Sequence, residues 1–223
     1  MCFSSVHAET TGGKREIAYV IKTLVGDGEW TSLKVNVPAL EASIGFPASI
    51  VQSKNGDLYF ASTSHHAVLK VEFNEQTGTS HVSIVAGTGS PDLAVDDVLA
   101  TESPLYTPYG VALIEDASDV VTAFLIADST HHRIRRVDTS TGLISTIAGS
   151  GSMGDKGDGG SATEARLKNP RHVYYDKSNG DIYIVDYSNS KIKRVRGGII
   201  TTVAGMCTDE GDEGDEEDAI DAC

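Results

Sequence analysis

Short apolar runs recur along the whole chain, and turns rich in Gly, Asn, Asp and Ser separate them. Three examples are LYFAS at 58–62, FLIA at 124–127 and IYIV at 182–185. Such runs are rich in β-branched and aromatic residues and are typical of strands. No stretch has the longer period of an amphipathic helix. The pattern therefore predicts an all-β fold.

The runs belong to a repeat that is marked by regularly spaced glycines. Gly26, Gly87, Gly149 and Gly205 each end an apolar run, at spacings of 61, 62 and 56 residues. A proline follows each of the first three glycines by 21 residues, at Pro47, Pro108 and Pro170. Between them lie the similar segments ALEAS, ATESP and ATEAR. Matching spacings in three copies indicate a repeat architecture.

Each repeat contains four apolar runs, and the first of them follows the proline. Tight turns between short runs predict an antiparallel four-stranded sheet. Such a sheet cannot bury both of its faces alone, whereas copies stacked radially bury one another, as in a β-propeller. The predicted blades lie near 46–87, 107–149 and 169–205, and an orphan outer strand is expected at 19–26.

The third copy carries the clearest resemblance to a known family. GDIYIVDYSNSKIKRV, together with the preceding ISTIAGSG and GDKGDGGSATEARLKNP, resembles the NHL repeat. The first copy departs most, because Ser62 stands where the others have Asp128 and Asp186. The resemblance covers about residues 19–223. It implies an NHL-type β-propeller with six blades as the complete form, of which about three are present as an incomplete ring.

The two ends of the chain lie outside the three complete repeats. Residues 1–18 form a short head, and 206–223 form an acidic inter-blade segment that opens a truncated fourth repeat. AIDAC at the C-terminus matches ALEAS, so we expect a fragment of a longer chain. The end blades would expose apolar positions, namely Ile50 and Leu58 in the first and Val173 and Ile182 in the third. We therefore expect self-association through open blade faces.

His131 and His132 are the first candidates for a chemical site. They align with His65 and His66 in the first copy and with Asn189 and Ser190 in the third. A tight turn accepts His, Asn and Ser because these residues tolerate the left-handed backbone region and form local hydrogen bonds. We expect turn residues rather than metal ligands, with Asp128 capping amides two or three residues ahead.

Basic residues gather on the third strand of each repeat. They are Lys70, Arg133, Arg135, Arg136, Lys191, Lys193, Arg194 and Arg196. We expect a solvated strand edge, which Lys and Arg protect against pairing with other chains. The alternative is a basic stripe that binds RNA. The net charge of −14 disfavours it, although nine acids at 209–221 supply most of the excess.

Other segments show no catalytic or metal-binding motif. GDKGDGGSAT at 154–163 has neither EF-hand nor phosphate-loop spacing, so it is interpreted as an inter-blade connection. Cys2, Cys207 and Cys223 are too far apart for a zinc knuckle. No apolar run has the roughly 18 residues of a membrane span. The first dozen residues lack a signal-peptide core, and the compartment stays open.

These observations predict a noncatalytic protein–protein interaction scaffold. No catalytic, cofactor-binding or metal-ligating residue is assigned and no cofactor is expected, but the partner is expected to be a protein. The resemblance also implies two alternatives, namely part of a metal-dependent propeller lyase or lactonase and an RNA-binding NHL domain. An enzyme on this fold would gather its ligands from several blades at the central axis.

Overall fold

The computed structural model describes residues 2–11, 14–29, 32–74 and 76–205, and the expected acidic segment at 206–223 lies outside them. Within this part the fold is all-β and follows the repeat. The strands of the first blade are β4 (Pro47–Gln52), β5 (Leu58–Ser62), β6 (Ala67–Asn74) and β7 (Thr79–Ala86). Those of the second are β9 (Pro108–Glu115), β10 (Val121–Asp128), β11 (Arg133–Asp138) and β12 (Leu143–Ala148). Those of the third are β13 (Pro170–Asp176), β14 (Asp181–Asp186), β15 (Lys191–Arg196) and β16 (Ile199–Ala204).

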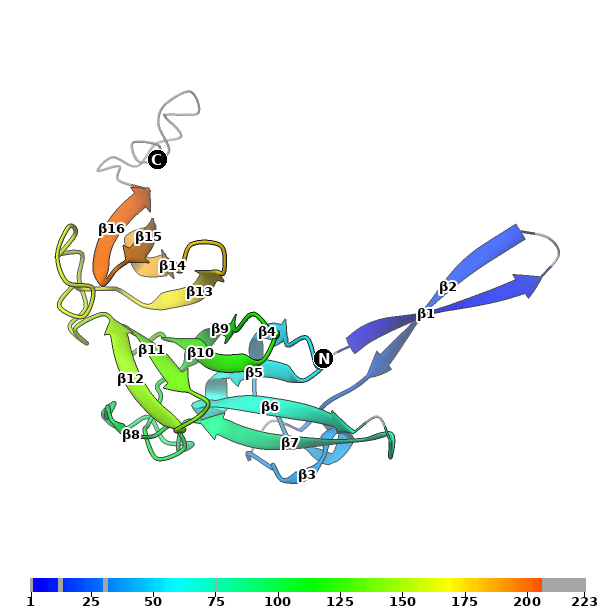
Figure 1. The fold of residues 1–223 in the computed structure, drawn as a ribbon. Helices are drawn as coiled ribbons and strands as arrows, with labels where there is room; N and C mark the ends of the chain where they lie inside the picture. Colours follow the sequence, from blue (N-terminus) through cyan, green and yellow to red (C-terminus); the bar gives the residue numbers. More distant parts are fainter. Residues whose placement is uncertain (1, 12–13, 30–31, 75, 206–223) are drawn as a thin grey trace.

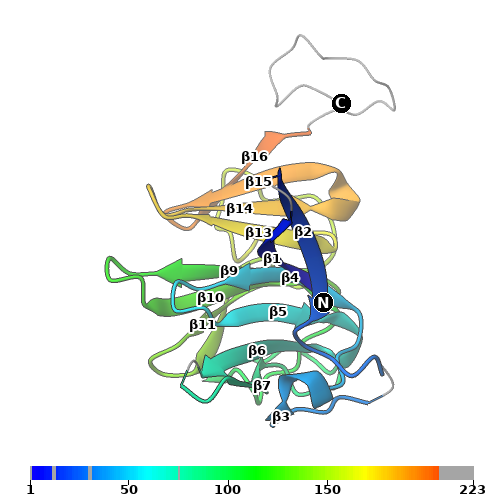
Figure 2. The same ribbon diagram turned by 90° about the vertical axis from the view of Figure 1, so that its right-hand side faces the viewer.

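Each blade is an antiparallel sheet whose strands follow sequence order. The innermost strands β4, β9 and β13 lie next to one another, and the sheets fan out from them (Figures 1 and 2). Short 3-10 turns follow the second strand in the first and third blades, as η2 (Thr63–His65) and η3 (Tyr187–Asn189). The arrangement is a propeller arc, as the repeat predicted, and the described residues do not close a ring.

Two blades contain a fifth strand that the repeat did not predict. β3 (Val37–Pro38) pairs with β7, and β8 (Val98–Leu99) pairs with β12. Both lie in inter-blade connections, and the first is followed by the 3-10 turn η1 (Ala39–Glu41). The connection therefore runs along the outer strand of the blade that it enters and satisfies part of that strand's free backbone edge. The prediction of four-stranded blades was incomplete in this respect.

The N-terminal residues form a hairpin of β1 (Cys2–Thr11) and β2 (Lys14–Thr23). The run expected to be an orphan outer strand at 19–26 is thus mostly part of β2, and its partner is β1 rather than a blade. The described part of the head and this run therefore belong to one β-hairpin, Cys2–Thr11 with Lys14–Thr23.

The core consists of three apolar layers. On β10, Phe124 and Ile126 pack toward the first blade, whereas Leu125 and Ala127 pack toward the third. This alternation follows from the strand, since successive side chains point to opposite faces. The third layer covers the other face of the first blade, where Leu58 packs with Val25, Ala39 and Ile44 from the preceding segment.

The expected exposed positions need correction. Leu58 is 4% exposed and Val173 is 1% exposed, because Leu58 faces the segment 24–44 and Val173 faces the second blade. The open side of the third blade instead carries Tyr183, Val185 and Ile192, which are half-buried. They occupy the positions that Leu125, Ala127 and Ile134 fill in the second blade, where all three are buried.

Candidate functional site

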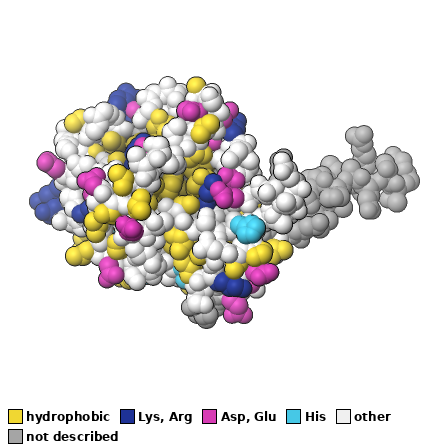
Figure 3. Space-filling view, turned by 60° about the horizontal axis from the view of Figure 1, so that its bottom comes forward, with side chains coloured by type: hydrophobic (Ala, Val, Ile, Leu, Met, Phe, Trp, Pro, Cys, Tyr) yellow, Lys and Arg dark blue, Asp and Glu magenta, His cyan; other side chains and the backbone are white. Residues whose placement is uncertain are grey.

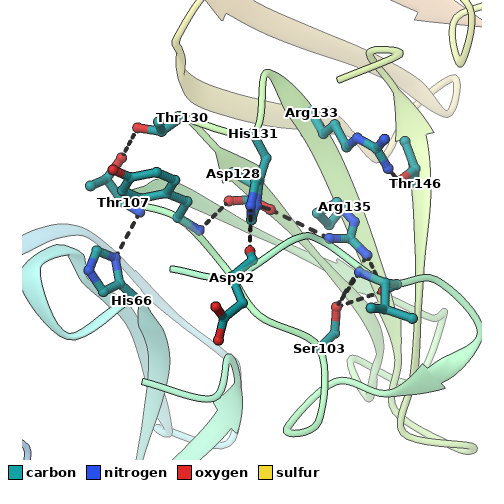
Figure 4. A network of polar contacts seen from close by, with 12 residues as sticks. His66, Asp92, Ser103, Thr107, Asp128, Thr130, His131, Arg133, Arg135 and Thr146 are labelled. Atoms are coloured by element: carbon teal, nitrogen blue, oxygen red, sulfur yellow. Dashed lines mark hydrogen bonds and ion pairs between the residues drawn. The ribbon is translucent and has the colours of Figure 1, made fainter. Parts of the chain in front are cut away.

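The turn at 128–132 is the center of a polar network (Figure 4). The carboxylate of Asp128 is fully buried and accepts a hydrogen bond from the backbone N–H of Tyr106 at 2.8 Å. Nδ1 of His131 lies 2.8 Å from the other carboxylate oxygen, and Nε2 lies 2.8 Å from the carbonyl oxygen of Asp92. His131 therefore ties the turn to the inter-blade connection.

The third blade repeats this network with different side chains. Asp186 accepts from the backbone N–H of Lys168, and Asn189 donates both to Asp186 and to the carbonyl of Gly154. Burial raises the pKa of Asp186 even though these hydrogen bonds favour its ionised form. His131 and Asn189 have equivalent roles here, because each contacts the aspartate of its own turn and a carbonyl oxygen of the preceding connection.

The expected Asx-type cap at Asp128 was wrong. The carboxylate bonds an amide 22 residues before it rather than two or three residues after it. The reason is that the chain enters each blade directly above this turn. Its partly buried N–H needs an acceptor, and the aspartate supplies one.

The second residue of each pair connects one blade to the next. Nδ1 of His66 accepts from the backbone N–H of Thr107, and Nδ1 of His132 accepts from that of Asn169. Burial lowers the pKa of both histidines below the ordinary value, which favours the neutral ring that this bond requires. His66 and His132 have φ of 50° and 57°, so the expected left-handed turn is confirmed.

Two of the third-strand cations do not lie at a solvated edge, which corrects the expectation for them. Arg135 is fully buried, and its Nη2 lies 2.7 Å from both the Asp96 carboxylate and the Val95 carbonyl. Lys193 is 1% exposed, and its Nζ lies 2.7 Å from Asp158. The third strand lies inside the sheet, and the connection places an acid over it.

The first blade replaces this ion pair with apolar residues. Leu69 is fully buried at the position of Arg135 and Lys193. Val35 stands at the position of Asp96 and Asp158 and packs against the apolar cluster that contains Leu69. Both members of the pair therefore change together. This joint replacement of a cation and an acid by apolar residues is visible when the three copies are aligned, and it could have indicated the ion pair.

Exposed aromatic residues gather on the face that carries these turns, which we call the turn face. It comprises the turns at 62–66, 128–132 and 186–190 and the residues that flank the three prolines. Phe46, Tyr106 and Tyr187 are 66%, 36% and 50% exposed there. Tyr106 makes edge contacts with His66 and His131. This surface was not predicted from the sequence, because no residue in it forms a motif.

A hollow lies along the innermost strands β4, β9 and β13. Its volume is about 280 Å³, and it is lined by Gln52, Glu115, His172 and Tyr174 among others. Figure 3 views the molecule from a different side. It shows hydrophobic side chains near the middle of that surface and acidic and basic side chains spread around them. Among the described residues, no group of three or more His, Cys, Asp or Glu side chains is placed to hold a metal ion.

Comparison with known proteins agrees with the repeat. No protein-family model matches the chain. It is 30% identical over 139 residues, 61% of its length, to NHL repeat-containing protein 2 of Bos taurus. The chain is thus similar in sequence to an NHL-repeat protein. It is also 29% identical over 205 residues, 83% of its length, to Teneurin-1 of Gallus gallus.

The chain spans only a small share of the length of these relatives. The chain spans 17% of the bovine protein and 7% of the teneurin. An auxiliary nutrient binding protein from Bacteroides thetaiotaomicron superimposes with a TM-score of 0.59 at 23% identity, over 74% of this chain and 39% of its own. A second, from Bacteroides ovatus, gives 0.54 at 22% identity, over 69% and 36%. These two likenesses show the propeller fold alone.

The contacts of the third-strand cations weigh against an RNA-binding stripe on these NHL repeats. Seven of the eight basic residues lie within 4 Å of a carboxylate in the described part of the chain. The exception is Arg194, which is half-buried. Paired cations neutralise few phosphates, because each would first have to leave its acid. Within the same residues no helix is long and apolar enough to cross a bilayer.

Proposed function

We propose that this chain is part of a noncatalytic scaffold that binds proteins through the turn face of its NHL repeats. The observation that carries the proposal is the group of exposed aromatic side chains Phe46, Tyr106 and Tyr187 on that face. Tyr and Phe are enriched where proteins bind one another, because their rings bury large areas and have few rotatable bonds. Rigid blades hold these side chains in place.

The polar residues of the turns and third strands support the same proposal. Asp128 and His131 bind the chain entering their own blade, and His132 binds the next blade. Arg135 and Lys193 neutralise acids of the connections. These contacts give each of the groups a structural role within or between the blades.

A capture experiment with surface variants tests the proposal. The chain of residues 1–223 is immobilised, and bound proteins are identified by mass spectrometry. Phe46→Ser and Tyr187→Ser should remove specific partners, whereas Leu143→Ser should retain them, because Leu143 is 41% exposed on the outer strand β12. Partners that are retained by both turn-face variants, or lost equally with Leu143→Ser, would contradict it.

The enzyme alternative has a direct test. A metal-dependent lyase or lactonase would need ligands from further blades around the hollow that contains Glu115 and His172. Elemental analysis of the purified chain should find zinc and calcium well below one equivalent. A stoichiometric metal that chelators remove would favour the enzyme.

RNA binding is tested by filter-binding titrations at several salt concentrations. We expect no submicromolar affinity near physiological salt, because the paired cations leave few free positive charges. Tight binding that weakens steeply with salt would favour the RNA-binding alternative over the protein-binding scaffold.

A further inference from the structure

One position of the repeat places a different side chain on the turn face in each blade. It is the residue after the proline, which is Ala48 in the first blade, Tyr109 in the second and Arg171 in the third. Each is the second residue of an innermost strand, and these strands are neighbours. The three side chains therefore lie along one line across the turn face.

Arg171 is held between two tyrosines. Its guanidinium carbon lies 3.6 Å from the centroid of the Tyr187 ring and 5.0 Å from that of Tyr109. Stacking of this kind stabilises a cation and leaves the N–H groups at the edge of the guanidinium directed outward. The side chain is exposed, and no carboxylate of the described residues lies within ion-pair distance of it. In a chain with a net charge of −14, this is an unneutralised cation in a fixed orientation.

The backbone fixes this arrangement at Gly110. A Cβ atom on Gly110 would lie 2.8 Å from Cα of His172 and 2.9 Å from the carbonyl oxygen of Arg171. Only a glycine permits so close an approach of β9 and β13. Tyr109 and Arg171 are therefore positioned before any partner arrives, which reduces the entropic cost of binding.

Tyr109 also lines an apolar hollow. Its volume is about 540 Å³, and it is lined by Phe46, Pro47, Ala48, Thr63, Ser64, Thr107 and Tyr109. The small side chain of Ala48 leaves this space open where the other blades have Tyr or Arg. An apolar side chain of a partner fits here, one aromatic ring away from the guanidinium.

We propose that the turn face binds a protein segment in which an Asp or Glu stands next to an apolar residue. The side-chain carboxylate pairs with Arg171 in the two-pronged geometry that guanidinium groups favour, and the apolar side chain enters the hollow beside Ala48. A single carboxylate fits this surface better than an acidic run, because the rest of the chain is acidic and repels one. This inference rests on the proposed scaffold function and specifies the partner's chemistry.

Two blocked peptides provide the probe, acetyl-Gly-Leu-Glu-Gly-amide and the same peptide with Gln in place of Glu. Each is titrated into the chain of residues 1–223, and the Nε–Hε resonances of arginine are followed by NMR. We expect the Glu peptide to bind about tenfold more tightly than the Gln peptide, since one charge-assisted pair is gained. The Arg171 resonance should shift only with the Glu peptide.

Three variants test the assignment. Arg171→Gln should abolish the preference for Glu, whereas Arg171→Lys should keep part of it. Ala48→Leu should weaken both peptides alike by filling the hollow. Arg136→Gln is the matched control, because Arg136 already pairs with Asp138, and it should change neither affinity. Thermal melts of each variant show that the fold is retained.

The outcomes separate the two proposals. Three results would overturn the inference. They are equal affinity for the two peptides, a Glu preference that survives Arg171→Gln, and no binding of either peptide at about 10 mM. If Tyr187→Ser abolishes partner capture but Arg171→Gln does not, the scaffold proposal stands and the carboxylate inference falls. If no turn-face variant affects capture, the scaffold proposal itself falls.

Discussion

The buried ion pair between Lys193 and Asp158 provides a quantitative test of how the connections hold the blades. The Lys193 side chain is 2% exposed, and its Nζ also lies 3.0 Å from Oγ1 of Thr202 and 3.3 Å from Asp155. Burial opposes the ionisation of Asp158, but its bonds to Lys193 and Thr202 prevail and lower its pKa. The first blade does without this pair, since Leu69, Val35 and Ile84 occupy the three positions.

Asp158→Val removes one partner and leaves a buried ammonium. Breaking a fully buried pair costs about 3–5 kcal/mol. The cost here is smaller, because Asp158 is 40% exposed and Asp155 still faces Lys193. We expect a loss of about 2 kcal/mol, which for a chain of this size lowers Tm by about 4–8 °C.

Lys193→Leu should cost less, because it leaves two carboxylates that water still reaches. The double variant should be more stable than Asp158→Val alone, and adding Thr202→Ile should restore near wild-type stability by reproducing the first blade. Replacing a buried pair by apolar residues is often neutral or stabilising.

Urea denaturation followed by far-UV circular dichroism measures the cycle. The coupling energy between the two substitutions should be about 1–2 kcal/mol. Additive losses, or an unchanged midpoint for Asp158→Val, would show that Lys193 is solvated in solution and that the ion pair does not hold the connection.

Three further predictions follow from the same contacts. Gly149→Ala should lower the free energy of unfolding, measured by urea denaturation, by about 2 kcal/mol more than Gly159→Ala. Both glycines have positive φ, but only a Cβ at 149 would meet a backbone atom, the His132 carbonyl oxygen at 2.2 Å. Equal losses would refute this prediction. Burial lowers the folded-state pKa of His132, so the stabilisation from its bond to the Asn169 N–H is present above the unfolded pKa and is lost as pH falls below about 6.5. The unfolding midpoint of His132→Ser should therefore vary less between pH 7 and 5 than that of wild type. The chain should self-associate in light scattering, more at high salt, and Val185→Lys on the open face of the third blade should reduce this; a salt-independent monomer would contradict the expectation.

The periodicity of the sequence determined the fold class and the order of the strands. Gly149 illustrates why, because its φ of 87° and its approach to His132 are properties of the local backbone, and they recur at Gly87 and Gly205. The proline that starts each blade and the alternation of Phe124 and Leu125 are equally local. A short-range pattern repeated three times is therefore sufficient to predict a propeller arc.

Only the tertiary structure decided what the polar residues do. Asp128 was interpreted as capping its own turn, whereas its partner is Tyr106, and Arg135 was placed at a solvated edge, whereas Asp96 covers it. These partners are separated by 22 and 39 residues. The fold of the connection, including the unforeseen strand β8, brings them together. The turn face depends on the fold in the same way, because Tyr109 and Arg171 meet only where two blades lie side by side. Composition and spacing describe one blade at a time, and these contacts form within connections and between blades.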